Sequence, residues 1–207
     1  MYFDRKCKIT YISHGATIYS EDGRICDTEP FPPLSDNGIE EIERVCEILK
    51  NRRIRNDKII SSAGLRCVQS AKIISKLFKQ NFVIDENLKP KNYGDFNGLT
   101  LSQIEAEHPE EFQTLIHNPD VAIPKNAQSI SDFLNETFFA IDKIVEENTD
   151  SRLIIITYPE IIQAAVAKAL KVPDSMVKNI YIKTGSLTQI SYFDKFESLI
   201  YCGYKAV

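Results

Sequence analysis

Apolar residues recur at every third or fourth position in several stretches of the chain, which is the spacing of amphipathic helices. The clearest case is residues 36–51, DNGIEEIERVCEILKN, where Ser35 or Asp36 could cap the first turn. The same spacing predicts helices at 65–78, 129–148 and 160–170, and shorter helical pieces around 101–108 and 109–116.

Continuous or alternating apolar runs predict the strands. Residues 152–158, RLIIITY, are nearly all apolar, as expected of a central parallel strand. Further strands are expected at 8–13, at 58–62 and within 81–88. Two alternating runs, at 186–193 and 198–204, flank a turn-like DKFE and predict a hairpin at one edge of the sheet.

Strands and helices alternate along the chain, which predicts an α/β fold: a three-layer α/β/α sandwich with a mostly parallel central sheet. The length of 207 residues fits a single domain, residues 1–207, with a loop-rich insertion around 89–126. In such sheets the functional site lies at the C-terminal ends of the strands. Residues 13–15, 61–63 and 157–159 are therefore the places to look for chemistry.

Composition narrows the class of protein. The net charge of −4 and a pI of about 5.5 argue against a nucleic-acid-binding or membrane-binding surface. The first ten residues lack the apolar segment of a signal peptide. Five scattered cysteines without a CxxC pair favour a reducing compartment over a disulfide framework. We therefore expect a cytoplasmic protein.

A histidine at the end of the first predicted strand, His14, could be a core residue, a metal ligand or a nucleophile. The chain has three histidines, and their spacing does not match that of metal ligands. No metal and no cofactor is therefore expected. The remaining readings of His14 depend on the segments that the fold would bring beside it.

Five segments, in order, resemble the histidine phosphatase superfamily, which has the phosphoglycerate mutase-like fold. Residues 13–17, SHGAT, correspond to the family's Arg-His-Gly-Glu-Thr, and residues 61–71, SSAGLRCVQSA, to its Ser-Ser-Pro-Leu-x-Arg-Ala-x-Gln-Thr-Ala. The later segments are LKPKNYGDFNG at 88–98, AQS at 127–129 and TYPE at 157–160. The resemblance covers essentially the whole chain.

The resemblance implies a mechanism in which the first-strand histidine attacks phosphorus and becomes a phosphohistidine. Two arginines and a second histidine stabilise the transferring group, and a carboxylic acid protonates the leaving oxygen. Compared with this pattern, the chain keeps His14 at the nucleophile position and Arg66 at the second arginine. Ser13 replaces the first arginine, and Tyr158 replaces the second histidine.

The acid is lost as well, since Pro90 stands at its usual position and Gln128 at the alternative one, and Glu160 adds a negative charge. The candidate phosphate-binding residues are Arg66, Ser13, Ser61, Ser62 and Tyr158, and the candidate substrate-loop residues are Lys89, Lys91 and Gln128. Each has a structural alternative: the serines could cap a helix, Tyr158 could fill the vacated pocket, and the lysines could be solvated.

The losses predict a degenerate, catalytically impaired member that binds a small phosphorylated or anionic ligand, such as inorganic phosphate, weakly, or that binds a protein partner. An alternative is an active phosphomonoesterase or phosphoglycerate mutase-like enzyme that uses a phosphohistidine at His14. A third is an interaction protein whose working surface lies elsewhere, for example a homodimer interface at the sheet edge.

Overall fold

The structure, a computed structural model, describes residues 5–26, 31–118 and 120–205, and its centre is one six-stranded sheet. The strands are β1 (Arg5–Ser13), β2 (Lys58–Ser62), β3 (Phe82–Asp85), β4 (Ser151–Thr157), β5 (Leu187–Phe193) and β6 (Glu197–Tyr204). Their order is β3-β2-β4-β1-β5-β6. The first four strands in this order are parallel, while β5 and β6 form an antiparallel hairpin at one edge. The mostly parallel sheet and the edge hairpin were both predicted.

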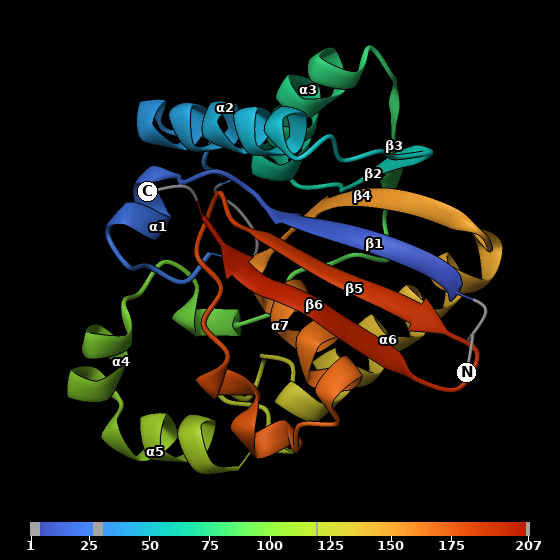
Figure 1. The fold of residues 1–207 in the computed structure, drawn as a ribbon. Coiled ribbons are helices and arrows are strands. Elements are labelled where there is room, and N and C mark those ends of the chain that lie inside the picture. Colours follow the sequence, from blue (N-terminus) through green and yellow to red (C-terminus); the bar gives the residue numbers. More distant parts are fainter. Residues whose placement is uncertain (1–4, 27–30, 119, 206–207) are drawn as a thin grey trace.

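Helices cover both faces of the sheet (Figure 1). The helices are α1 (Ile18–Glu21), α2 (Asp36–Asn51), α3 (Leu65–Phe78), α4 (Leu101–Glu107), α5 (Pro109–His117), α6 (Ile130–Glu147) and α7 (Pro159–Leu170), with 3-10 turns η1 (Gly94–Phe96) and η2 (Asp174–Asn179). The helices α2 and α3 lie on one face, and α6 and α7 lie on the other. This is the expected three-layer arrangement.

The loop-rich stretch packs beside the sandwich as a small lobe of its own. Phe96, Ile104 and Leu115 form a separate apolar cluster there, apart from the main core around the sheet. Residues 24 and 25, which follow α1, bind this lobe, because the N–H of Ile25 donates to the carbonyl of Leu99 at 2.8 Å. The lobe therefore stands next to the segment that follows β1 and α1.

Three short elements, α1, η1 and η2, were not predicted, because three to six residues are too few to show a helical period. Thr17 begins α1 with a capping box, in which its side chain accepts from the N–H of Ser20 and the Ser20 hydroxyl accepts from the Thr17 N–H.

Among the described residues, no helix is long and apolar enough to cross a membrane.

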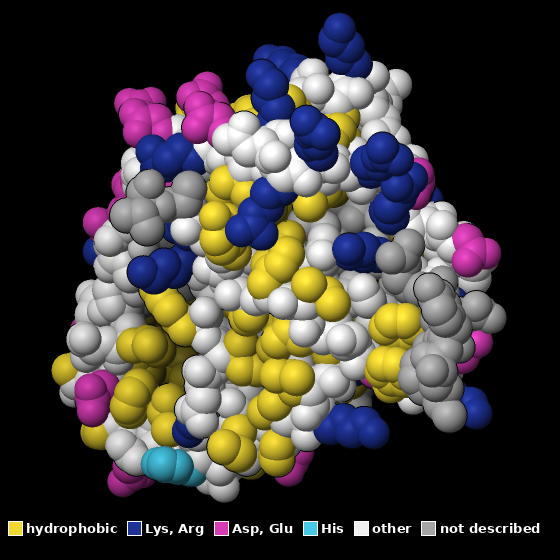
Figure 2. All heavy atoms as spheres, in the orientation of Figure 1, with side chains coloured by type: hydrophobic (Ala, Val, Ile, Leu, Met, Phe, Trp, Pro, Cys, Tyr) yellow, Lys and Arg dark blue, Asp and Glu magenta, His cyan; other side chains and the backbone are white. Residues whose placement is uncertain are grey.

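Charges are unevenly distributed over the surface. Figure 2 shows Lys and Arg side chains gathered over the α2–α3 side, and hydrophobic side chains gathered over β5 and β6. Arg52 joins the two regions, since its guanidinium carbon lies 4.0 Å from the ring centroid of Tyr204.

Candidate active site

The parallel register places the three predicted strand ends together. Ser13 pairs with Thr157 across β1 and β4, and Ser61 pairs with Ile156 across β2 and β4. Immediately beyond, the N–H of His14 donates to the carbonyl of Thr157 at 3.0 Å, and the carbonyl of His14 accepts from the N–H of Gly185 at 2.9 Å. The backbone of His14 is thus fixed from both sides.

The His14 side chain is 4% exposed and is held in one orientation. Its Nδ1 lies 2.8 Å from the carbonyl oxygen of Gly15, and its Nε2 accepts from Nε of Arg66 at 3.2 Å. Burial, and then the positive charge of Arg66, lower the pKa of His14 to about 3, although the Gly15 contact opposes this shift. The ring is therefore neutral at pH 7, with the proton on Nδ1 and a lone pair on Nε2.

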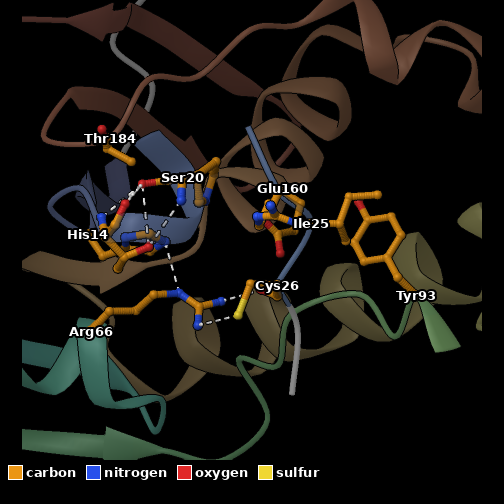
Figure 3. A pocket seen from close by; sticks show the side chains of 11 residues that line it. His14, Ser20, Ile25, Cys26, Arg66, Tyr93, Glu160 and Thr184 are labelled. Atoms are coloured by element: carbon orange, nitrogen blue, oxygen red, sulfur yellow. Dashed lines mark hydrogen bonds between the residues drawn. The ribbon is translucent and has the colours of Figure 1, made fainter. Parts of the chain in front are cut away.

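Arg66 is the cation that faces this lone pair. It lies in the first turn of α3 and is 4% exposed. Besides His14, its guanidinium donates to the carbonyl oxygen of Cys26 at 2.6 Å, and Nη1 lies 3.8 Å from the Cys26 sulfur. The guanidinium therefore joins the start of α3 to the segment after α1 (Figure 3).

Tyr158 lies beside His14 and Arg66 but is buried behind them, with 3% exposure. Its ring meets the His14 ring edge-on, with centroids 5.9 Å apart, and the Arg66 guanidinium carbon lies 4.7 Å from its centroid. The hydroxyl is directed at Gly64, where an added Cβ would lie 2.0 Å from it. The tyrosine ring thus supports the two site residues from behind, and its hydroxyl does not line the pocket.

The three candidate serines are fully buried, and none of them lines the pocket. The Ser62 hydroxyl is 2.7 Å from that of Thr157, and the Ser61 hydroxyl donates to the Ser62 carbonyl. The alternative that Ser61 or Ser62 caps α3 is wrong, because the N-cap is Gly64 and no side chain caps this end. The Ser13 hydroxyl has no hydrogen-bond partner in the described structure.

The pocket in front of His14 has a volume of about 170 Å³. Its lining residues are His14, Thr17, Ser20, Arg24, Ile25, Cys26, Arg66, Tyr93, Pro159, Glu160 and Thr184. Figure 3 shows His14 and Arg66 on one side of it, Tyr93 on the other, and Glu160 between them in this view. The lining thus combines a neutral imidazole, two guanidinium groups, four hydroxyls of which one is phenolic, one thiol and one carboxylate.

The sequence reasoning missed several of these residues, above all Arg24, Thr17, Ser20 and Thr184. They lie on the segment around α1 and on the loop before β5, where no periodic pattern marks them. Arg24 is held by its Nη1, which donates to the Gly98 carbonyl at 2.9 Å, and its side chain is 36% exposed. A basic residue soon after a candidate nucleophile was the only available signal.

The candidate loop residues lie elsewhere. Lys89 and Gln128 line a second cavity together with Pro90. Lys91 is 4% exposed, with its Nζ 4.3 Å from the ring centroid of Tyr93. Of these, only Lys91 is connected to the His14 pocket, through Tyr93.

The described residues contain no group of three or more His, Cys, Asp or Glu side chains that could hold a metal ion.

Comparison with known proteins gives the family. The sequence model of the histidine phosphatase superfamily, branch 1, matches residues 9–202, so the chain belongs to this superfamily. The chain is 26% identical over 168 residues to phosphoglycerate mutase-like protein 4 of Arabidopsis thaliana. The aligned region covers 78% of this chain and 70% of the relative.

Solved structures agree on the fold. Bacillus stearothermophilus YhfR superposes with a TM-score of 0.86 at 19% identity, covering 97% of this chain and 98% of that one. The alpha-ribazole phosphatase from Shigella flexneri superposes with a TM-score of 0.82 at 19% identity, covering 97% and 98%. At this identity the likeness establishes the fold alone.

Proposed function

We propose that the chain binds a small phosphate monoester in the His14 pocket and hydrolyses it slowly, through a phosphohistidine at His14. The observation that carries the proposal is the buried, neutral His14 ring in the wall of the pocket, whose Nε2 lone pair accepts from Nε of Arg66 at 3.2 Å. This is the electronic state that a nucleophilic imidazole needs. The Nδ1–H contact with the Gly15 carbonyl would stabilise the positive charge that the ring gains when Nε2 bonds to phosphorus.

The missing groups explain why the reaction should be slow. Ser13 and Tyr158 are uncharged at the two positions where the family's motifs have an arginine and a histidine, and neither side chain lines the pocket. Each missing charge stabiliser costs about 10²–10³ in rate when it acts alone. Such losses are not additive when groups act as a unit, so the total is smaller than their product. Arg24 supplies a second guanidinium, but a partly exposed one.

Weak binding of inorganic phosphate is the first expected result. Two guanidinium groups with one carboxylate nearby should give a Kd no tighter than roughly 1 mM, or about −4 kcal/mol. Isothermal titration calorimetry should show this binding lost in Arg66→Gln and unchanged in Lys89→Gln, which removes a cation from the second cavity. Micromolar phosphate binding by the wild type would contradict the impaired site.

Turnover is tested with p-nitrophenyl phosphate. Activity should be low, and His14→Ala should abolish it, with an acid-labile phosphoenzyme trapped in the wild type only. If His14→Ala leaves the activity unchanged, the phosphohistidine mechanism is wrong, and binding alone remains as the role of the pocket.

A further inference from the structure

One carboxylate lines the His14 pocket among the described residues, and it belongs to Glu160. This residue lies in the first turn of α7, directly after Tyr158 and Pro159 at the end of β4. It therefore comes from the same strand end that packs against the nucleophile. A pocket of about 170 Å³ is small, comparable to a cavity that holds a single benzene ring. Groups that line it lie near any ester bound there.

The positions expected to hold a proton donor face another cavity. Pro90 and Gln128 line the second cavity together with Lys89, Asp132 and Glu136, and neither lines the His14 pocket. A proton donor for the leaving oxygen must therefore come from a different element of this chain. Of the groups in the pocket, a carboxyl has the lowest pKa apart from the buried imidazole and is the most ready donor.

The charge of Glu160 acts on the site itself. It contributes to raising the pKa of the Tyr158 hydroxyl, where burial is the largest cause, and also that of the Cys67 thiol on α3. Figure 3 shows Glu160 between Tyr93 and the side of the pocket formed by His14 and Arg66. A dianionic ester bound beside it would raise the pKa of the Glu160 carboxyl by like-charge repulsion, and so load it with a proton.

The simpler explanation is that Glu160 only stabilises the start of α7 through the helix dipole. The chain contains a matched case for this role. Helix α5 also begins with proline followed by glutamate, Pro109 and Glu110, and Glu110 lies outside the His14 pocket. The two glutamates share their helix position and differ in what they face.

We propose that Glu160 is the general acid and base of the reaction, an inference that rests on the function proposed above. In the first step, the Nε2 lone pair of His14 forms the N–P bond while the ester P–O bond breaks. The leaving oxygen keeps that electron pair and takes the proton of Glu160. In the second step, water attacks phosphorus, the N–P electron pair returns to Nε2, and the Glu160 carboxylate takes the proton of the water.

The test compares leaving groups. Phenyl phosphate has a poor leaving group that needs the acid, whereas p-nitrophenyl phosphate needs it little. Glu160→Gln should lower kcat/KM for phenyl phosphate by about 10²-fold and for p-nitrophenyl phosphate by less than about tenfold. Glu110→Gln should change neither. In the wild type, kcat for phenyl phosphate should fall at high pH as Glu160 in the ester complex loses its proton. Glu160→Asp should keep this limb, and Glu160→Gln should lose it.

Two failures are distinguishable. If turnover in the wild type does not depend on His14, the proposed function and the acid role both fall. If turnover depends on His14 but Glu160→Gln lowers kcat/KM equally for both esters, or keeps the high-pH limb, the acid role alone is overturned. Should Glu160→Gln not fold, Glu160→Asp provides the comparison: a changed ratio between the two esters supports the proposal, and an unchanged ratio contradicts it.

Discussion

His14 combines burial with a charged neighbour, and both keep it neutral. Desolvation disfavours the imidazolium, and the Arg66 guanidinium repels it, so the pKa in the folded state is about 3, compared with 6.5 for an ordinary histidine. The same feature that prepares Nε2 as a nucleophile has a consequence for stability. Below pH 6.5, the unfolded chain binds a proton on this residue that the folded chain excludes.

The free energy of unfolding should therefore fall as the pH drops from 6.5 toward 3, by at most about 1.4 kcal/mol per pH unit from this residue. Between pH 7 and pH 5, the wild type should lose about 2 kcal/mol more than His14→Gln, which has no titrating ring. Urea unfolding at the two pH values measures the difference. Equal losses in the two proteins would show that His14 titrates normally in the folded state.

At the level of elements, the position of the His14 loop depends on a close approach by α2. An added Cβ on Gly38 would lie 2.0 Å from the carbonyl oxygen of Ala16, and one on Gly15 would lie 2.2 Å from the Gly38 carbonyl oxygen. Ser35, the N-cap of α2, donates its N–H to the Ala16 carbonyl at 2.9 Å. The first turn of α2 thus packs directly on the backbone that follows the nucleophile.

Gly38→Ala should destabilise the protein by about 1–3 kcal/mol, because the loop and the helix must separate. The sign is informative, since alanine in an unconstrained helix position would stabilise by about 1 kcal/mol relative to glycine. Glu43→Ala, at an exposed position of the same helix, should stay within about 0.5 kcal/mol. Thermal unfolding and phosphate titration check both variants, and a stabilised Gly38→Ala with unchanged phosphate binding would contradict this account.

Periodicity predicts elements well when they are long and pack on the sheet. The pattern in 36–51 predicted α2 to the residue, and the apolar run in 152–158 predicted β4 as a central parallel strand, which pairs with β1 and β2. It does not predict which strand-end side chain enters a pocket, because that depends on the local turn. Ser61 and Ser62 are thus fully buried, while Thr17, Ser20 and Arg24, on the short helix α1 and the residues beside it, line the pocket.

Over the whole molecule, one set of residues packs the core and stabilises the fold, and a largely different set determines the charge of the site. The sandwich is held by apolar burial around the sheet, and the residues that fill the core are largely not those that would hold a phosphate. The fold matches known structures along most of its length, with the uncharged Ser13 next to His14 in sequence and the uncharged Tyr158 ring beside the His14 ring. We therefore expect that basic residues introduced at positions 13 and 158 would create a stronger phosphate site on the existing backbone.

The double variant Ser13→Arg with Tyr158→His should bind phosphate at least about tenfold tighter than the wild type, and each single variant should gain less, because the groups hold one ligand together. Without ligand it should be less stable, since Ser13 is fully buried and an arginine there is a buried charge. At 10 mM phosphate, a Kd of about 1 mM stabilises the folded state by about 1.4 kcal/mol, and a Kd of about 0.1 mM by about 2.7 kcal/mol.

The measurement is the shift in Tm between 10 mM phosphate and chloride at matched ionic strength. Ser102→Arg adds the same charge at an exposed position on α4 and should shift no more than the wild type. A double variant that folds but gains no more from phosphate than the wild type would mean that the backbone around His14 no longer has the shape of a phosphate site. In that case, the weak phosphate binding would result from the backbone conformation after β1 and β4, and not from the two side chains.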